Sequence, residues 1–223
     1  MSVYNNQLTV GNAIKSIIDQ EFSDWELLIC DDASIDNTYE IINDFKNIDN
    51  RIKLFRNSTN LGLTKSLNRL IENVKSKIIA RQDSDDISFK NRFTEQEKYI
   101  SLEKYDFVVS RAKIKHKQII RPKYSYMLPA SFIVNFKNPF IHGTLMIKTE
   151  VLRKIGNYNE KFYYAQDYKL FSDLLSAGYK HKKINFPLYE LNVKDNISSK
   201  FTNEQDYYAR CVRQNVLPTN FNK

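Results

Sequence analysis

Residues 77–86 read KIIARQDSDD, a short apolar run that leads directly into clustered carboxylates. Such a run predicts a buried strand, with Asp83, Asp85 and Asp86 at its carboxyl end. Open α/β sheets bind ligands at that edge, and carboxylate oxygens there suit a divalent metal that carries phosphate. The cluster also suits a solvated turn before a helix near Phe89, so these residues alone leave both interpretations open.

A second acidic strand end lies upstream. Residues 25–30 (WELLIC) form a continuous apolar run that leads into Asp31 and Asp32. Residues 34–37 are suited to cap the following helix, whereas the two aspartates precede that cap. In dinucleotide folds a carboxylate at this place accepts hydrogen bonds from a ribose hydroxyl, and it can also accept one from a base N–H.

A third acidic site precedes a predicted helix. Residues 163–168 read YYAQDY, and the apolar positions that follow, with Gly178 as a C-terminal stop, predict a helix that begins near Asp167. The helix dipole favours an ionised carboxylate in the first turn. Asp167 is therefore either an ordinary first-turn residue or a general base in a cleft.

In this order, the three acidic sites resemble those of the family 2 glycosyltransferases with the GT-A fold. The resemblance extends from Val3 to about Leu191, and it is carried by residues 3–6, 26–34, 51–52, 60–63, 79–86, 155–158 and 165–170. It implies one α/β domain with a Rossmann-like, mainly parallel sheet flanked by helices. Within residues 3–191, residues 3–86 would bind the nucleotide sugar and residues 107–191 the acceptor. Residues 192–223 would form a C-terminal tail, which we expect to be helical.

The resemblance also assigns roles to single residues. Asp167 matches the catalytic base. Asp83 and Asp85 match the outer positions of the DXD motif, with Asp85 as the main ligand of Mn²⁺ or Mg²⁺ and Asp83 on the ribose side. Gln166 stands where many relatives have a Glu, which leaves a role for a second charge in question.

Further residues are expected around the donor. Those expected to bind the nucleotide sugar are Tyr4, Asn5, Asp31, Asp32, Asn60, Gly62, Lys65, Arg81 and Asp83. Lys65 and Arg81 would neutralise diphosphate charge, although surface or packing roles fit them equally well. His142 would contact the acceptor or a phosphate, or else serve as a hydrogen-bonded structural group.

Composition indicates a single soluble domain. The chain has 223 residues, 42% of them hydrophobic, and a mean hydropathy of −0.53. No apolar run approaches the length of a membrane span and no signal sequence is recognisable, so we expect a cytoplasmic protein. Cys30 and Cys211 suggest neither a disulfide framework nor a zinc site.

The chain has a net charge of +8, which bears on the binding partners that we expect. Basic residues gather at 113–123 and again at 180–183. They indicate either solvated surface or attraction to an anionic membrane at the inner face of the cell or to a phosphate-bearing acceptor. No nucleic-acid-binding signature is present, so we expect no nucleic acid partner. A homodimer is compatible with the sequence.

The first strand departs from the family pattern. Family members have several aliphatic residues before the Val3 position, whereas this chain has only Met1 and Ser2. The sequence therefore predicts a truncated central strand with unpaired neighbours, which dimerisation or the tail from Asn203 to Leu217 would have to cover.

The expected activity is metal-dependent transfer of a sugar, with inversion, from a nucleoside diphosphate sugar, most simply a UDP-sugar. The acceptor would be a hydroxyl of a glycan or lipid-linked acceptor in surface polysaccharide synthesis. Two alternatives stay open: a catalytically weak binding or assembly subunit, and a nucleotidyltransferase. The second is disfavoured because residues 3–11 contain one Gly and no Lys or Arg.

Overall fold

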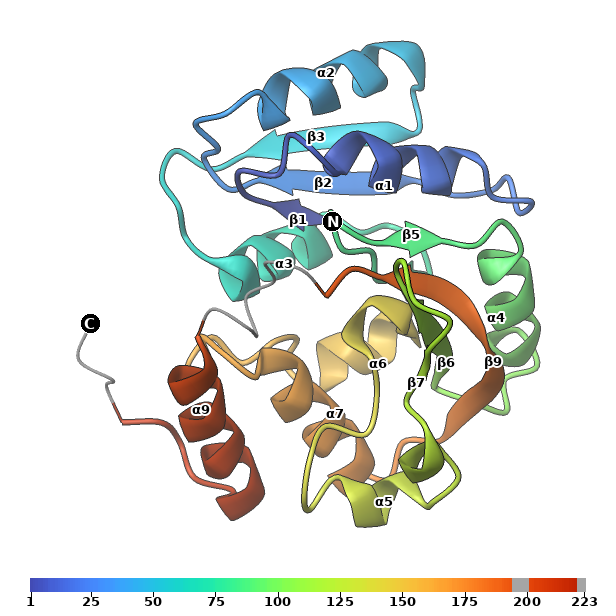
Figure 1. The fold of residues 1–223 in the computed structure, drawn as a ribbon, viewed down its shortest axis with the longest axis vertical. Helices are drawn as coiled ribbons and strands as arrows, with labels where there is room; N and C mark the ends of the chain where they lie inside the picture. The colour runs from blue at the N-terminus through green and yellow to red at the C-terminus, as the bar shows by residue number, and fades with distance from the viewer. Residues whose placement is uncertain (194–200, 220–223) are drawn as a thin grey trace.

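The first half of the chain builds a parallel sheet. The computed structural model describes residues 1–193 and 201–219, and Figure 1 shows this sheet at the top of the view. Its strands, in spatial order, are β1 (Ser2–Val3), β2 (Leu27–Asp31) and β3 (Ile52–Arg56). The connecting helices are α1 (Val10–Ile18) and α2 (Thr38–Ile48), and α3 (Leu63–Glu72) follows β3. α1 buries Val10, Ala13, Ile14 and Ile17, the spacing of a single helix face.

The second half builds a mixed sheet. Its strand order is β4 (Ile78–Ala80), β8 (Met146–Lys148), β6 (Phe107–Ile114), β9 (His181–Leu191) and β5 (Ile87–Ser88), and β7 (Ile120–Arg121) pairs with β6. Only β6 and β9 run parallel; the other pairs are antiparallel. The helices of this half are α4 (Arg92–Ile100), α5 (Ala130–Ile133), α6 (Thr149–Lys154) and α7 (Gln166–Ser176), with single turns η1 (Tyr124–Tyr126) and η2 (His142–Thr144).

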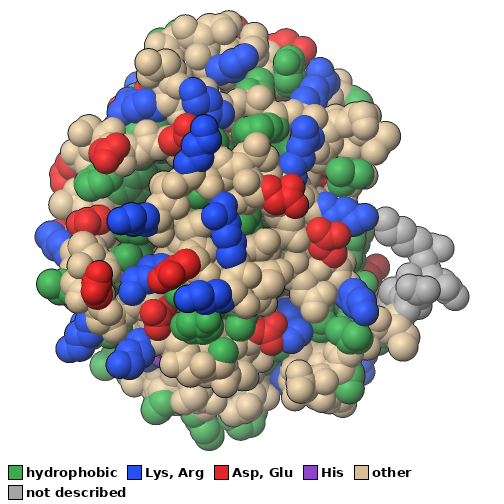
Figure 2. Space-filling view, turned by 180° about the vertical axis from the view of Figure 1, so that it is seen from behind, with side chains coloured by type: hydrophobic (Ala, Val, Ile, Leu, Met, Phe, Trp, Pro, Cys, Tyr) green, Lys and Arg blue, Asp and Glu red, His purple; other side chains and the backbone are tan. Residues whose placement is uncertain are grey.

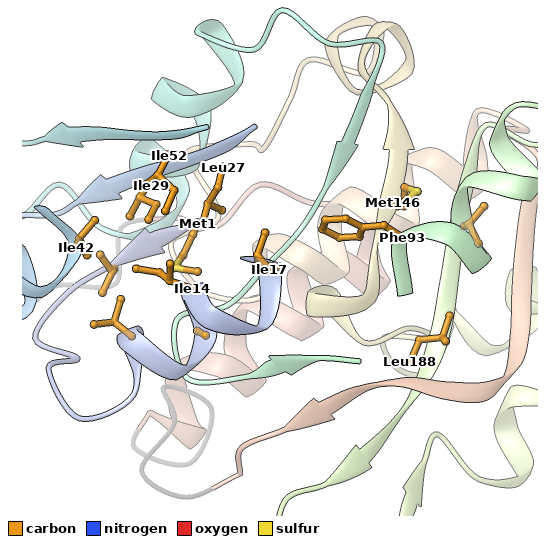
Figure 3. Packing of buried hydrophobic residues seen from close by; sticks show 14 of the residues in the cluster. Met1, Ile14, Ile17, Leu27, Ile29, Ile42, Ile52, Phe93, Met146 and Leu188 are labelled. Carbon is orange, nitrogen blue, oxygen red and sulfur yellow. The ribbon is translucent and has the colours of Figure 1, made fainter. Parts of the chain in front are cut away.

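Alternation along β6 sends side chains into two cores. Val108 packs in the core that contains α4, whereas Phe107 and Val109 pack with α6 and α7. The first core also joins the two sheets: Figure 3 shows Met1, Ile14, Ile29 and Ile52 from the first half of the chain, and Phe93, Met146 and Leu188 from the second. The chain therefore folds as the single mixed α/β domain that the sequence predicts.

Most elements lie where the apolar patterns place them. The run at residues 77–81 forms β4, the helix after Tyr164 is α7, and the last strand is β9. Residues 117–140 are irregular as expected, with only β7, η1 and α5. The predicted helical tail contains α9 (Thr202–Gln214), while residues 194–200 and 220–223 of that tail lie outside the described residues.

The first strand is shortened but present. Ser2 pairs with Cys30 and Val3 with Asp31, and the amino group of Met1 donates a hydrogen bond to the Leu28 carbonyl at 2.7 Å. Within the described residues β1 pairs only with β2, so β1 and β4 do not join and the expected single sheet is divided in two. Of the two alternatives for covering the gap, the tail does not serve, because Tyr208, Cys211 and Val212 of α9 pack beside α7.

An apolar groove marks the division between the sheets. Leu27 and Leu28 of β2, together with Met1, line one side, and β4 lines the other; the α3 side chains Leu67, Leu70 and Ile71 also contribute. Burial lowers the pKa of the Met1 amino group to about 5, so this amine is neutral at pH 7. The groove thus offers apolar walls and strand edges to an extended segment.

Adding four Val or Ile residues ahead of Met1 should raise the melting temperature by about 3–8 °C, because they would fill the groove and replace a buried amine with an amide. Differential scanning calorimetry measures the shift. The control is an extension of four Gly or Ser residues, which supplies backbone without apolar side chains. Equal melting temperatures for both extensions would contradict strand insertion.

Candidate functional site

An acidic loop follows β4. The Arg81 guanidinium donates hydrogen bonds to the Asp83 carboxylate and to the Gln82 carbonyl, and Arg81 itself is buried. Arg81, expected to neutralise phosphate, is therefore already paired with Asp83. This ion pair lowers the net negative charge of the loop. Asp85 is half-buried and so remains partly accessible at the surface.

The pKa values of Asp85 and Asp86 are both raised. Burial, and then the charge of Asp83, raises the pKa of Asp85 to about 6. The same two causes raise the pKa of Asp86, whose carboxylate accepts a hydrogen bond from the Asn192 amide at 2.6 Å. A bound cation would reduce the repulsion among these clustered carboxylates and favour their ionised form. No three His, Cys, Asp or Glu side chains converge on one point in the described part of the chain, so a metal would need ligands from the donor as well.

A buried polar network supports the acidic loop. The guanidinium of Arg92 donates to the Arg81 carbonyl at 2.8 Å, to the Ser88 hydroxyl at 2.8 Å and to the Gln96 side-chain oxygen at 2.9 Å. Arg92 is fully buried. The sequence analysis did not single it out, because an arginine in the first turn of a helix carries no signal that it points inward.

Tyr189 of β9 is a second support that the sequence analysis missed. Its hydroxyl accepts a hydrogen bond from the Asp83 amide at 3.0 Å, and its ring lies 4.9 Å from the Arg92 guanidinium carbon. Gly143 makes room for it, since a Cβ at that position would lie 2.6 Å from the Tyr189 hydroxyl oxygen. Gly143 is therefore required by packing against the residue that holds the acidic loop.

Gly143→Ala should lower the free energy of unfolding by about 1–3 kcal/mol, because Tyr189 must move from its place. The matched control is Gly11→Ala in α1, where a Cβ meets only ordinary contacts at 3.6 Å or more. The control should be neutral or stabilising by up to about 1 kcal/mol. Urea unfolding of both variants measures the difference, and equal stabilities would contradict the packing argument.

Asp167 is held at the start of α7. Its Oδ1 accepts a hydrogen bond from the Tyr168 amide at 2.8 Å, and its Oδ2 accepts one from the Asn138 side chain at 2.8 Å. Burial, with a smaller contribution from the charge of Asp83, raises the pKa of Asp167 to about 6. The carboxylate is therefore ionised at pH 7, fixed in orientation and a better base than an exposed aspartate.

His142 is paired with a tyrosine. Its Nε2 lies 2.6 Å from the Tyr158 hydroxyl, and the Asn68 side chain binds the backbone of Tyr158. Burial, followed by the charge of Arg81, lowers the pKa of His142 to about 3, so the ring is neutral. A neutral ring can contact an acceptor or a phosphate only as a hydrogen-bonding group; this contact stays a prediction.

The expected nucleoside side is built around Asp32. Its carboxylate accepts hydrogen bonds from the Asn57 side chain at 2.6 Å, the Leu61 amide at 2.9 Å and the Gly62 amide at 2.8 Å. Asp31 is fully buried, 3.1 Å from the exposed Arg56 guanidinium. Both aspartates thus shape their loops, and nucleoside contact by either stays a prediction.

The other residues expected on this side differ in exposure. Asn5 has φ of 49° and its side chain accepts a hydrogen bond from the Ile35 amide at 2.9 Å, so it joins the β1 and β2 loops. Tyr4, Asn60 and Lys65 are exposed, and Gly62, with φ of 87°, lies against Tyr163. A hydrogen bond of 2.6 Å between Asn6 and Ser84 ties this side to the acidic loop.

The predicted residues therefore form two connected groups. Electrostatic coupling to Asp83 links the acidic loop with Asp167 and His142, and the Asn6–Ser84 bond links it with the loops after β1 and β2. These residues lie in the loops after β1, β2 and β4 and at the start of α7, and open α/β folds bind their ligands beyond the carboxyl ends of the strands.

The sequence profile of glycosyl transferase family 2 matches residues 1–165. The chain belongs to this family. The putative glycosyltransferase EpsE of Bacillus subtilis is 30% identical over 196 residues, which cover 86% of this chain and 70% of EpsE. The O-antigen biosynthesis glycosyltransferase WbnJ of Escherichia coli is 32% identical over 183 residues, 79% of this chain and 70% of WbnJ.

Solved structures show the same fold. S. aureus TarS 1-349 in complex with UDP-GlcNAc has a TM-score of 0.75 at 18% identity, and covers 90% of this chain. The mannosyltransferase PcManGT from Pyrobaculum calidifontis, in complex with GDP-Man and Mn²⁺, has a TM-score of 0.75 at 18% identity, and covers 97% of this chain. This chain spans 59% and 64% of those two chains. The GT-A fold expected from the sequence is thus confirmed.

Proposed function

We propose that this glycosyltransferase moves a sugar from a nucleoside diphosphate sugar to a hydroxyl of a glycan or lipid-linked acceptor, with inversion, in surface polysaccharide synthesis. The observation that carries the proposal is Asp167, an oriented carboxylate with a raised pKa in the same site as the acidic loop. Its place opposite a negatively charged loop fits a base that serves the acceptor rather than the donor.

The chemistry is a single displacement. Asp167 accepts the proton of the acceptor hydroxyl while that oxygen forms a bond to the anomeric carbon. The bond from that carbon to the diphosphate oxygen breaks, and the diphosphate leaves with the electron pair. One displacement inverts the configuration at the anomeric carbon. Asn138 and the Tyr168 amide keep the carboxylate pointed at the acceptor during this step.

Asp85, with Asp83, fits a divalent cation. Burial, and then the charge of Asp83, raises the pKa of the half-buried Asp85, so a cation would lower the cost of keeping the loop ionised. A bound Mn²⁺ or Mg²⁺ would balance charge on the departing diphosphate. The Mn²⁺ in the complex of PcManGT with GDP-Man supports this choice. Arg81 would keep Asp83 in place beside the ion.

A UDP-sugar is the donor that we propose. TarS has been solved with UDP and with UDP-GlcNAc, and a relative 29% identical over 187 residues is named as a UDP-Glc-dependent β-1,3-glucosyltransferase of E. coli. The name of that relative gives a diphosphoundecaprenol-linked sugar as its acceptor, which supports a lipid-linked acceptor here. Calorimetry with UDP-, GDP- and ADP-sugars plus Mn²⁺ tests this choice; heat without sugar release would instead indicate a binding subunit.

Asp167→Asn should cut turnover by about 10²–10⁴-fold, because the amide keeps the shape of the side chain but accepts no proton. Donor binding should change little, since Asp167 acts on the acceptor. Initial rates of donor consumption and calorimetric donor affinity measure the two effects. The melting temperature of the variant must be measured beside its rate, because the neutral amide avoids burying a charge but sets its NH2 group against the Asn138 donor.

The pH profile is the control for this assignment. Asp167 must lose its proton, so the parent rate should rise with pH through about 6 and then level off. The groups that face the carboxylate are Asn138, Tyr158, Asp83 and Arg81. Turnover of Asp167→Asn within threefold of the parent would remove Asp167 from the role of base.

Asp85→Ala should weaken Mn²⁺-dependent binding of nucleoside diphosphate by about tenfold or more, and a chelator added to the parent should act in the same way. Isothermal titration with and without Mn²⁺ measures both effects. Asp19→Ala, in the turn after α1, serves as the control for removal of a carboxylate. If diphosphate binds the parent equally well with Mn²⁺ and with chelator, the acidic loop is not a metal site.

A further inference from the structure

All of the net charge of the chain arises in one segment. Residues 107–149 contain eight Lys and Arg and no Asp or Glu. The other 26 Lys and Arg are matched by 26 Asp and Glu, so the total of +8 belongs to this segment. Its cations are Arg111, Lys113, Lys115, Lys117, Arg121, Lys123, Lys137 and Lys148.

The same segment exposes large apolar side chains. They lie on η1, α5 and the residues beside them, with exposed fractions of 88% for Tyr124, 69% for Met127, 47% for Leu128, 54% for Phe132 and 62% for Phe136. We call these five residues the apolar ridge. Figure 1 places α5 at the lower end of the molecule, and Figure 2 shows hydrophobic side chains gathered at that end in the opposite view.

The backbone beneath the ridge is fixed. The Lys183 amino group donates hydrogen bonds to the carbonyls of Tyr126 and Leu128 at 2.6 and 2.7 Å. The Tyr126 hydroxyl is bonded to the carbonyls of Val109 and Ile184. The ridge is therefore anchored to β6 and β9.

Cations border the ridge. Lys123 precedes Tyr124, Lys137 follows Phe136, and all four side chains are exposed. Arg111 lies over the Tyr126 ring, with its guanidinium carbon 5.2 Å from the ring centre. Aromatic and long apolar side chains between exposed cations match the interface of an anionic bilayer, where rings enter the headgroup region and Lys or Arg contacts phosphate.

We propose that the apolar ridge docks on a membrane surface that contains anionic lipid. No helix of the described residues is long and apolar enough to cross a membrane, so the contact would be peripheral. A nucleic acid would be attracted by the cations but would leave five apolar side chains without a partner.

Docking would bring the base close to the membrane. The Tyr168 hydroxyl donates to the Val134 carbonyl at 2.6 Å, and Asn138 donates to Asp167. The ridge and the base are thus joined by two short hydrogen bonds through α7. This link to a lipid-linked acceptor rests on the proposed function, whereas membrane docking does not.

The test is sedimentation of the full chain with vesicles. We expect binding to vesicles made of equal parts of phosphatidylcholine and phosphatidylglycerol, little binding to phosphatidylcholine alone, and weaker binding as salt rises. Phe132→Ser with Phe136→Ser should weaken binding by about tenfold, and Lys123→Glu with Lys137→Glu by at least about 20-fold. Leu102→Ser with Lys75→Glu is the matched control, since both residues are exposed outside the segment.

Vesicle binding that the control pair weakens as much as the ridge pairs would overturn the proposal, and so would equal binding to both vesicle types. Binding to a DNA duplex that excludes anionic vesicles would assign the cations to nucleic acid instead. A dimer that the Phe variants dissociate, without vesicle binding by the parent, would make the ridge an interface between two copies. If the parent chain binds anionic vesicles but transfers no sugar, the proposed function is refuted and the docking proposal stands.

Discussion

The site depends on a guanidinium that is buried without an aspartate or glutamate bonded to it. Arg92 binds the end of β4 through the Arg81 carbonyl, β5 through Ser88 and its own helix through Gln96. Burial lowers the pKa of Arg92 to about 10, which leaves it charged at neutral pH. The positive charge of Arg92 beneath the acidic loop offsets repulsion among the carboxylates of that loop. The hydrogen bonds of Arg92 also fix the path of the chain where it leaves β4.

The charge of Arg92 offsets only part of the repulsion among the carboxylates of the site. Burial raises the pKa values of Asp85 and Asp167 to about 6, and the charge of Asp83 makes a smaller contribution to each. In a purely structural loop such like charges would only cost stability. In the site that we propose, with a cation on one side and Asp167 as proton acceptor on the other, the same charges would raise cation affinity and base strength.

The sequence showed the strands and the acidic ends, because apolar runs and carboxylate clusters are local patterns. It placed β4 and α7 correctly, and through the family resemblance it predicted that Asp83 and Asp167 share one site. It could not show Arg92 or Tyr189, whose roles depend on contacts between residues far apart in the chain. It predicted a truncated first strand, and the structure shows a short one in which Ser2, Val3 and the Met1 amine pair with β2.

The irregular segment between β6 and β8, on the expected acceptor side, has no periodic pattern that a sequence analysis could use. Apart from β7, which pairs with β6, its backbone is held by side chains from β9 and α7, as the bonds of Lys183 to Tyr126 and of Tyr168 to Val134 show. Irregular backbone of this kind can vary without disturbing the sheet, because its supports come from outside the segment. Asn138 lies in this segment and donates a hydrogen bond to Asp167, so a change there would alter the carboxylate that we propose as the base as well as the expected acceptor surface.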